Sequence, residues 1–366
     1  MLHFGKASEG MKLETMRHFF KKNKNIKVVS VFAAAALLIF VTLITLVLGV
    51  YKFQWNGRFI SFTEKVIPFP AVYIRDAGII TVSAVKENTA SVKRFYESQD
   101  FEQVGMRVDF STDQGKKRLK IKEKEVINKM IENKIIECLA QERGIQVDDN
   151  LIDQLVEDSI SKFGNRENLV SDLGKLYGWT IEDFKQKVVK PEIYADKLEE
   201  VYSQEVDTSK QKKKADFAWT EAVKKKKDFA KLAKELSDGE SAKNGGDLGW
   251  STRKQLVSEV SEKAFSMKVG EISEVIQSPL GFHVVKLEDR KSENDEDLVR
   301  LRQIFIQIKT FADWLKEKIK EFQIVVLLQD YYWDKGSASV EFTDPNLREF
   351  EENLLVNSEG DPSALP

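Results

Sequence analysis

The chain has 366 residues with 57 basic and 59 acidic side chains, so its formal net charge is only −2. This length exceeds one typical domain and predicts two or three. Because positive and negative residues are interspersed, the charge pattern gives no case for nucleic acid as a partner, and none is expected. Cys138 is the only cysteine, which excludes an intrachain disulfide and dithiol redox chemistry.

An apolar segment without a charged residue runs from Val28 to Tyr51. About 20 such residues span the bilayer core as a helix, and a cleaved signal peptide would have a shorter apolar stretch. The aromatic residues between Tyr51 and Trp55 are typical of a membrane interface. Basic residues are frequent between Lys12 and Lys27 and sparse after the segment. The positive-inside rule therefore predicts a single-pass anchor in the cell membrane, with residues 1–27 cytoplasmic and the bulk of the chain extracytoplasmic.

The exported part is predicted to begin with an extended linker over residues 52–74, because this stretch contains Pro68 and Pro70. Amphipathic helices follow. The strongest extends from Gly115 to Arg143, where apolar residues recur at intervals of three and four. Others are predicted to begin after Asp148, at Leu169 and at Thr180. Residues 75–207 are therefore predicted to form an all-α domain.

Three sequence blocks occur in order in the second half of the chain. Residues 241–250 contain a Gly-Gly-Asp-Leu-Gly turn, residues 264–273 contain the end of a helix and a Gly-Glu-Ile-Ser turn, and residues 281–285 form a strand with His283. This combination resembles the parvulin (PpiC-type) family of peptidyl-prolyl cis-trans isomerases from Asp228 to Arg290. The resemblance implies an α+β fold with isomerase (rotamase) activity.

The helical region also resembles a known module. The stretch from Ile135 to Val147, then Phe163-Gly164, then Tyr177 to Thr180, is similar to the N-terminal helical domain of the SurA and PrsA chaperones. The similarity covers roughly Arg75 to Gln204. It implies a module that binds unfolded chains, although apolar stripes on helices are by default core, and no single residue is assigned a binding role.

Elimination limits the possible chemistry. His3 and His18 precede the apolar segment, which leaves His283 as the only histidine in the exported part. A histidine-rich metal site is therefore excluded, and neither a metal nor a cofactor is expected. No nucleophile elbow favours serine hydrolysis, and no phosphate-binding glycine loop is present. Prolyl isomerisation fits this limit, because a catalyst only has to hold the proline ring and favour the twisted amide.

The resemblance to parvulins implies a role for particular side chains. His283 matches the histidine of the C-terminal strand and would polarise the site, and Ser278 would supply a supporting hydroxyl. Leu256 and Val260 match the apolar positions that contact proline. Gln303 occupies the position of the family's first histidine.

Several positions depart from the family pattern. Ser251 and Val260 replace phenylalanines that line the proline-binding slot of parvulins. Gly239 replaces a Cys or Asp, and Gln303 replaces a histidine. The predicted isomerase activity is therefore weak. These departures favour an alternative, a non-catalytic chaperone that keeps the parvulin fold as a peptide-binding platform. A third alternative is a structural or adaptor protein of the envelope.

The first strand of the parvulin pattern is absent before Ala215, where the chain is already predicted to be helical. The segment from Val299 to Ile308 has the shape of that strand and carries apolar residues on both faces, as a central strand does. The polar stretch from Lys291 to Asp297 is long enough to loop back. We expect this strand to pair beside the strand of His283, which places Gln303 near His283 in a circularly permuted domain; an unrelated appended strand is the alternative.

The predicted organisation is completed by the C-terminal part. Residues 208–310 form the parvulin-like α+β domain, residues 311–343 a short helix and a β-hairpin extension, and residues 344–366 an acidic tail that either frays or docks as one helical face. The sequence thus predicts an α+β, membrane-anchored extracytoplasmic foldase. Its expected partners are unfolded or proline-containing exported polypeptides.

Overall fold

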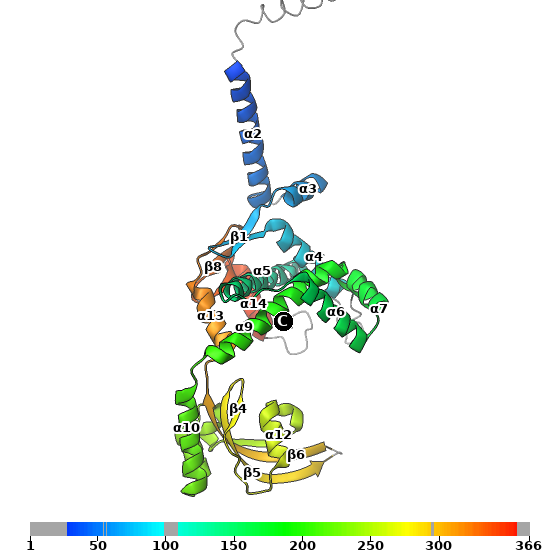
Figure 1. Ribbon diagram of the computed structural model, residues 1–366. Helices are drawn as coiled ribbons and strands as arrows, with labels where there is room; N and C mark the ends of the chain where they lie inside the picture. Colours follow the sequence, from blue (N-terminus) through cyan, green and yellow to red (C-terminus); the bar gives the residue numbers. More distant parts are fainter. Residues whose placement is uncertain (1–27, 54, 56, 99–108, 294–295, 357–366) are drawn as a thin grey trace, which may run out of the picture.

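The computed structural model describes residues 28–53, 55, 57–98, 109–293 and 296–356. Figure 1 shows a long helix, a helical domain at its end, and a smaller domain joined to the helical domain by two chain segments. The predicted cytoplasmic segment, residues 1–27, and the last ten residues of the predicted tail lie outside the described residues.

The long helix is α2, Val28–Tyr51. Among the residues that the structure describes, it is the one helix long and apolar enough to cross a membrane, and its apolar window is 0% buried. Its last turn is different. Val50 is 5% exposed within the core of the helical domain, and the Tyr51 hydroxyl donates a hydrogen bond to the Pro70 carbonyl oxygen at 2.8 Å. The end of α2 is therefore part of the folded domain.

The prediction that residues 52–74 form an extended linker is wrong. It contains a helix, α3 (Arg58–Val66), and a strand, β1 (Pro70–Ile74). The strand forms because it finds pairing partners on both sides, which a sequence window does not reveal.

The helices predicted by periodicity are present. They are α5 (Asp113–Glu142), α6 (Asp149–Phe163), α7 (Arg166–Asp172), α8 (Ile181–Phe184) and α9 (Lys190–Glu205), with π-helical turns at Leu173–Tyr177 and Lys185–Val189; a further helix, α4 (Val82–Ser98), precedes them. Thr112 and Asp148 cap α5 and α6 through their side-chain oxygens. The second π turn ends two residues before Pro191, whose missing N–H interrupts a regular α-helical ladder.

The helical domain is not all-α. A three-stranded antiparallel sheet has the order β2-β1-β7, with β2 at Gly78–Thr81 and β7 at Ile324–Val326. The strand β7 comes from the far end of the chain. The predicted C-terminal extension therefore belongs to the helical domain.

The other C-terminal elements pack on the same domain. They are α13 (Phe311–Glu321), β8 (Tyr331–Asp334), β9 (Ser339–Phe342) and α14 (Pro345–Val356). Lys124 on α5 forms ion pairs with Glu341 at 2.9 Å and Glu351 at 2.6 Å. Phe342 is fully buried in the same core as Val50. The first part of the predicted acidic tail thus docks as a helix.

The smaller domain contains α10 (Ser209–Trp219), α11 (Phe229–Leu236), β3 (Asp247–Ser251), α12 (Ser258–Ser266), β4 (Ile276–Ser278), β5 (Gly281–Glu293) and β6 (Glu296–Gln307). Its antiparallel sheet has the order β3-β6-β5-β4. The predicted pairing of residues 299–308 beside the strand of His283 is confirmed. Circular permutation stays a prediction, because pairing shows where a strand lies and not how the chain order arose.

Each face of this sheet has its own core. On one face α10 and α11 cover Phe282, Val284, Ile304 and Ile306. On the other face α12 covers Val285, Leu287, Val299 and Leu301. Alternate residues of β5 and β6 thus serve opposite faces, as the pleat of a strand requires.

The glycine turn of the family motif lies against β6. Gly246 has φ +77°, and its carbonyl oxygen accepts the Gln303 N–H at 2.8 Å. A Cβ at Gly246 would lie 2.3 Å from the Gln303 carbonyl oxygen. Glycine is required here for both its conformation and the close approach of two backbones.

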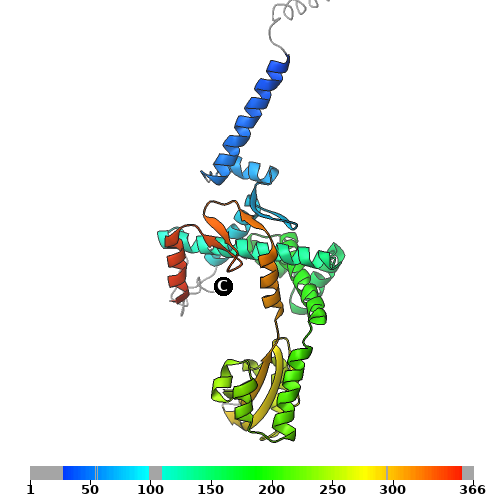
Figure 2. The same ribbon diagram turned by 90° about the vertical axis from the view of Figure 1, so that its left-hand side faces the viewer.

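The two connections to the smaller domain run side by side, from α9 into α10 and from β6 into α13 (Figure 2). The Tyr202 hydroxyl on α9 donates to the Lys309 carbonyl oxygen at 2.8 Å. The smaller domain is therefore inserted into a helical domain that is built from both ends of the chain.

Candidate functional site

The polar centre of the smaller domain is His283 on β5, which is 2% exposed. Its Nδ1 lies 3.2 Å from Gln303 Oε1, and its Nε2 lies 2.7 Å from Ser278 Oγ. An amide oxygen only accepts, so Nδ1 carries the hydrogen and the Ser278 hydroxyl donates to Nε2. The structure thus brings together three of the five residues that the sequence singled out.

The imidazole is held in its neutral form. Burial lowers the pKa of His283 below its ordinary value of 6.5, and this outweighs the hydrogen bond with Gln303 and the charge of Glu259, which both raise it. A neutral imidazole with one fixed tautomer can orient its two partners without carrying charge into the site.

Glu259 was not among the predicted residues. It lies on the first turn of α12, and its Oε2 is buried with no hydrogen-bond partner among the described residues. Its position directly before Val260, one of the two predicted proline contacts, was the available signal. An orphaned carboxylate oxygen near a buried histidine is costly unless a donor reaches it, so Glu259 belongs with the functional candidates.

Phe305 was also missed. Its ring stacks on the His283 ring with centroids 4.8 Å apart. Gly239, the predicted Cys or Asp position, lies next to it, since a Cβ there would be 3.5 Å from Phe305 Cδ1. Phe305 and Gln303 alternate on β6 and share the face of His283, so the period of the strand was the signal that locates both.

The two predicted proline contacts lie in the neighbouring core. Leu256 is half-buried and packs against the cluster beneath α12. Val260 is 1% exposed inside that cluster, so its side chain offers a substrate almost no surface. The roles assigned to the five residues, His283, Gln303, Ser278, Leu256 and Val260, stay predictions.

A cavity of about 450 Å³ lies against this centre, at the junction with the helical domain. Ser278 and Glu259 line it, together with Tyr202, Val206 and Phe311 from the two connecting segments. His283 is therefore connected to this cavity through Ser278, and the lining of the cavity combines polar residues with apolar ones such as Val206 and Phe311.

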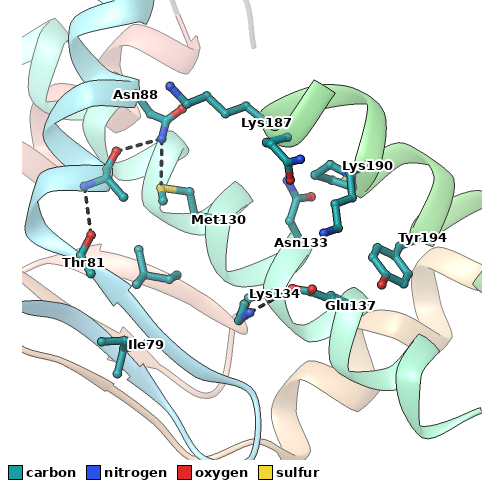
Figure 3. A pocket seen from close by; sticks show the side chains of 14 residues that line it. Ile79, Thr81, Asn88, Met130, Asn133, Lys134, Glu137, Lys187, Lys190 and Tyr194 are labelled. Carbon is teal, nitrogen blue, oxygen red and sulfur yellow. Dashed lines mark hydrogen bonds and ion pairs between the residues drawn. The ribbon is translucent and has the colours of Figure 1, made fainter. Parts of the chain in front are cut away.

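The helical domain has hollows of its own. One, of about 400 Å³, lies between β2, α4, α5 and the start of α9 (Figure 3). Some of its polar groups pair with each other: Asn88 Nδ2 donates to the Ala84 carbonyl oxygen at 2.8 Å, and Lys134 pairs with Glu137 at 2.9 Å. A larger hollow of about 670 Å³ lies between α6, α7 and α9. Its apolar lining residues are Leu155, Val156, Ile160, Leu169, Phe184, Val189 and Ile193.

The class of the smaller domain follows from comparison with known families. Residues 195–289 match the family described as rotamase, PPIC-type PPIASE domain. This confirms the resemblance that the glycine turn and the His283 strand predicted. The matched region ends before β6.

The foldase protein PrsA of Caldanaerobacter subterraneus subsp. tengcongensis is 30% identical over 256 residues, which cover 62% of this chain and 82% of that protein. The PrsA of Geobacillus sp. strain WCH70 is 30% identical over 196 residues, 46% of this chain. This chain spans 64% of that relative's length. A crystal structure of peptidylprolyl isomerase (PrsA) from Bacillus anthracis is 19% identical, with a TM-score of 0.19, and the match covers 63% of this chain and 96% of that one. The chain belongs to the PrsA foldase family.

Proposed function

We propose that this protein is a membrane-anchored foldase that binds unfolded, proline-containing polypeptides and catalyses their peptidyl-prolyl cis–trans isomerisation with weak activity. The observation that carries the proposal is the buried His283, fixed between Ser278 and Gln303 and stacked on Phe305. This centre lies in the PPIC-type domain of a PrsA relative.

The reaction breaks no bond. Rotation about the prolyl amide costs ~18–20 kcal/mol because resonance is lost in the twisted state. The site can lower this barrier by holding the proline ring on apolar surface and by presenting fixed dipoles to the twisted amide. Ser278 lines the cavity and His283 does not, so His283 acts as a positioning residue for Ser278.

Isomerisation of a proline tetrapeptide series, followed by NMR exchange or coupled proteolysis with the full chain, tests this role. Each lost hydrogen bond costs ~1 kcal/mol, so His283→Ala, which removes two, should lower kcat/KM about thirtyfold. Ser278→Ala should lower it several-fold, whereas Ser266→Ala, an exposed serine on α12, should not. Unchanged turnover in His283→Ala would reject the assigned role. Turnover equal to that of a complete parvulin would reject our interpretation of the altered slot.

A second candidate function is chaperone activity without catalysis. It is favoured by the apolar hollow between α6, α7 and α9, which is large enough to hold several side chains of an unfolded chain. Leu155, which is 39% exposed there, can be replaced with Glu, and Leu327, 42% exposed on another surface, provides the control. Loss of aggregation suppression in Leu155→Glu alone supports this function. Absence of both suppression and isomerase activity in the unmutated protein supports the structural alternative.

The membrane anchor is supported by the packing of α2. A cleaved segment would take Val50 and Tyr51 away from the core that they help to form. The basic residues before Val28 then favour a cytoplasmic N-terminus. We expect the full chain to resist alkaline extraction from membranes. A reporter fused after Pro366 should be active outside the cytoplasm, and activity only inside would overturn the orientation.

A further inference from the structure

The short helix α3, Arg58–Val66, has one side that faces the helical domain. Ile60 is 7% exposed and Glu64 is 3% exposed on this side. Glu64 Oε1 accepts a hydrogen bond from Lys86 Nζ on α4 at 2.7 Å. This contact fixes the rotation of α3 about its own axis.

A second side of α3 is apolar and uncovered. Phe59 is 69% exposed, and Phe62 and Val66 are each 65% exposed. With about 3.6 residues per turn, these three side chains lie on one face, and Ser61 and Lys65 lie on a third. Two exposed phenylalanines on one helical turn form an apolar patch that water does not favour.

The position of this patch is set by the end of α2. A helix of 24 residues is about 36 Å long, slightly more than the ~30 Å hydrocarbon core, so Tyr51 would lie at the headgroup level of a bilayer crossed by α2. Trp55 folds back on this end: a Cβ on Gly49 would lie 2.4 Å from Trp55 Cε3. Phe53 stacks on Trp55 with ring centroids 6.0 Å apart.

The helix α3 lies directly beside that end. Both views show it next to the base of α2 and running away from the axis of α2, on the side of the helical domain nearest to α2 (Figures 1 and 2). Because Val50 is buried in the core and Tyr51 is bonded to Pro70, the domain cannot swing far from the end of α2. The helix α3 is therefore held near the depth where a bilayer changes from hydrocarbon to headgroups.

We propose that the face of α3 formed by Phe59, Phe62 and Val66 inserts into the interfacial layer of the leaflet from which α2 emerges. The partner is the lipid bilayer itself, since α2 is apolar and uncovered along most of its length, and Phe53 and Trp55 at its end are exposed as well. The foldase is then attached to the membrane at two places, and the second attachment limits how far its domains tilt. This inference depends on the proposed membrane anchor.

The test uses the full chain in proteoliposomes, with Cys138→Ser as background so that one introduced cysteine carries an environment-sensitive fluorophore. Phe62→Cys and Val66→Cys report on the uncovered face, and Ser61→Cys is the matched control on the same helix. Quenching is measured with lipids that carry a quencher near the headgroup and, separately, with aqueous iodide. A quencher attached to lipid detects contact with the bilayer and not contact with another protein.

We expect lipid-borne quenching at positions 62 and 66 to be at least about twofold greater than at position 61, with the opposite order for iodide, because an interfacial helix buries one face ~5–10 Å deep. Equal lipid quenching at the three positions would overturn the proposal. Protection from iodide without lipid quenching would also overturn it and assign the patch to a second copy of the chain or to a bound polypeptide. Release of the protein by alkaline extraction would instead refute the anchor, and this readout is independent of the label.

Discussion

Replacement of Ile304 with alanine is the sharpest test of the role of β6 in the smaller domain. Ile304 is fully buried, pairs across the sheet with Val284, and packs in the core beneath α10 and α11. Loss of a buried isoleucine side chain costs ~2–5 kcal/mol, because burial of its methyl and methylene groups is lost and a cavity remains. Because β6 is hydrogen-bonded on both sides, the site cannot collapse easily, so we expect ~3–4 kcal/mol.

The measurement combines urea unfolding with hydrogen exchange, which assigns the loss to a domain. Exchange of β5 and β6 peptides should accelerate in Ile304→Ala while α5 stays protected. Ile304→Val, expected to cost ~0.5–1.5 kcal/mol, gives a graded result if the alanine variant does not fold. Ile79→Ala is the matched control, because Ile79 is 42% exposed in β2 of the other domain.

A decrease below ~1 kcal/mol in the free energy of unfolding for Ile304→Ala would refute the reasoning, since truncation of a buried side chain in a central strand costs more than that. An equal effect of Ile79→Ala would show that burial does not determine the cost. The first outcome would mean that residues 299–308 are not an essential strand of this sheet.

Three further predictions follow from single contacts. Because the pKa of His283 is lowered in the folded chain, the unfolded chain binds more protons as pH falls through 6.5, and the free energy of unfolding decreases toward acid pH. His283→Gln should make this decrease smaller in urea unfolding measured between about pH 7.5 and 5. An unchanged pH dependence of the free energy of unfolding would contradict the prediction. Gly246→Ala should cost at least about 2 kcal/mol more than Gly270→Ala, because both glycines have positive φ but only Gly246 faces a backbone oxygen; equal Tm losses would refute this. Phe342→Ala should destabilise the helical domain by ~3–5 kcal/mol and expose α5 to hydrogen exchange, whereas Tyr332→Ala, at a 39% exposed position, should cost less than ~1 kcal/mol; unchanged protection of α5 would separate the C-terminal hairpin from that core.

The elements with a strong local pattern could be predicted. Three patterns each reflect the surroundings of a single element. They are the length and apolarity of α2, the spacing of apolar residues in α5, and the apolar residues on both faces of β6. The family blocks around Gly246 and His283 could be recognised because close backbone approach and a buried polar centre tolerate few residue types.

The candidate site was only partly predictable. The proximity of Gln303 to His283 follows from strand pairing and was expected. The stacking of Phe305 and the orphaned oxygen of Glu259 were not, since they depend on the register of β6 and the placement of α12. Val260 is apolar, as a residue that contacts proline should be, yet the packing of α12 buries its side chain in the core.

The sequence by itself determined the apolar span, the helices, the family of the smaller domain and the strand that completes its sheet. Only the tertiary structure decided that β7, α13 and α14 complete the N-terminal domain, that the end of α2 is part of that core, and that α3 turns two phenylalanines away from it. Periodicity shows which face of an element is apolar, but the surface that covers this face comes from residues hundreds of positions away. Pairing over such distances depends on edges and cores that exist only once the chain has folded.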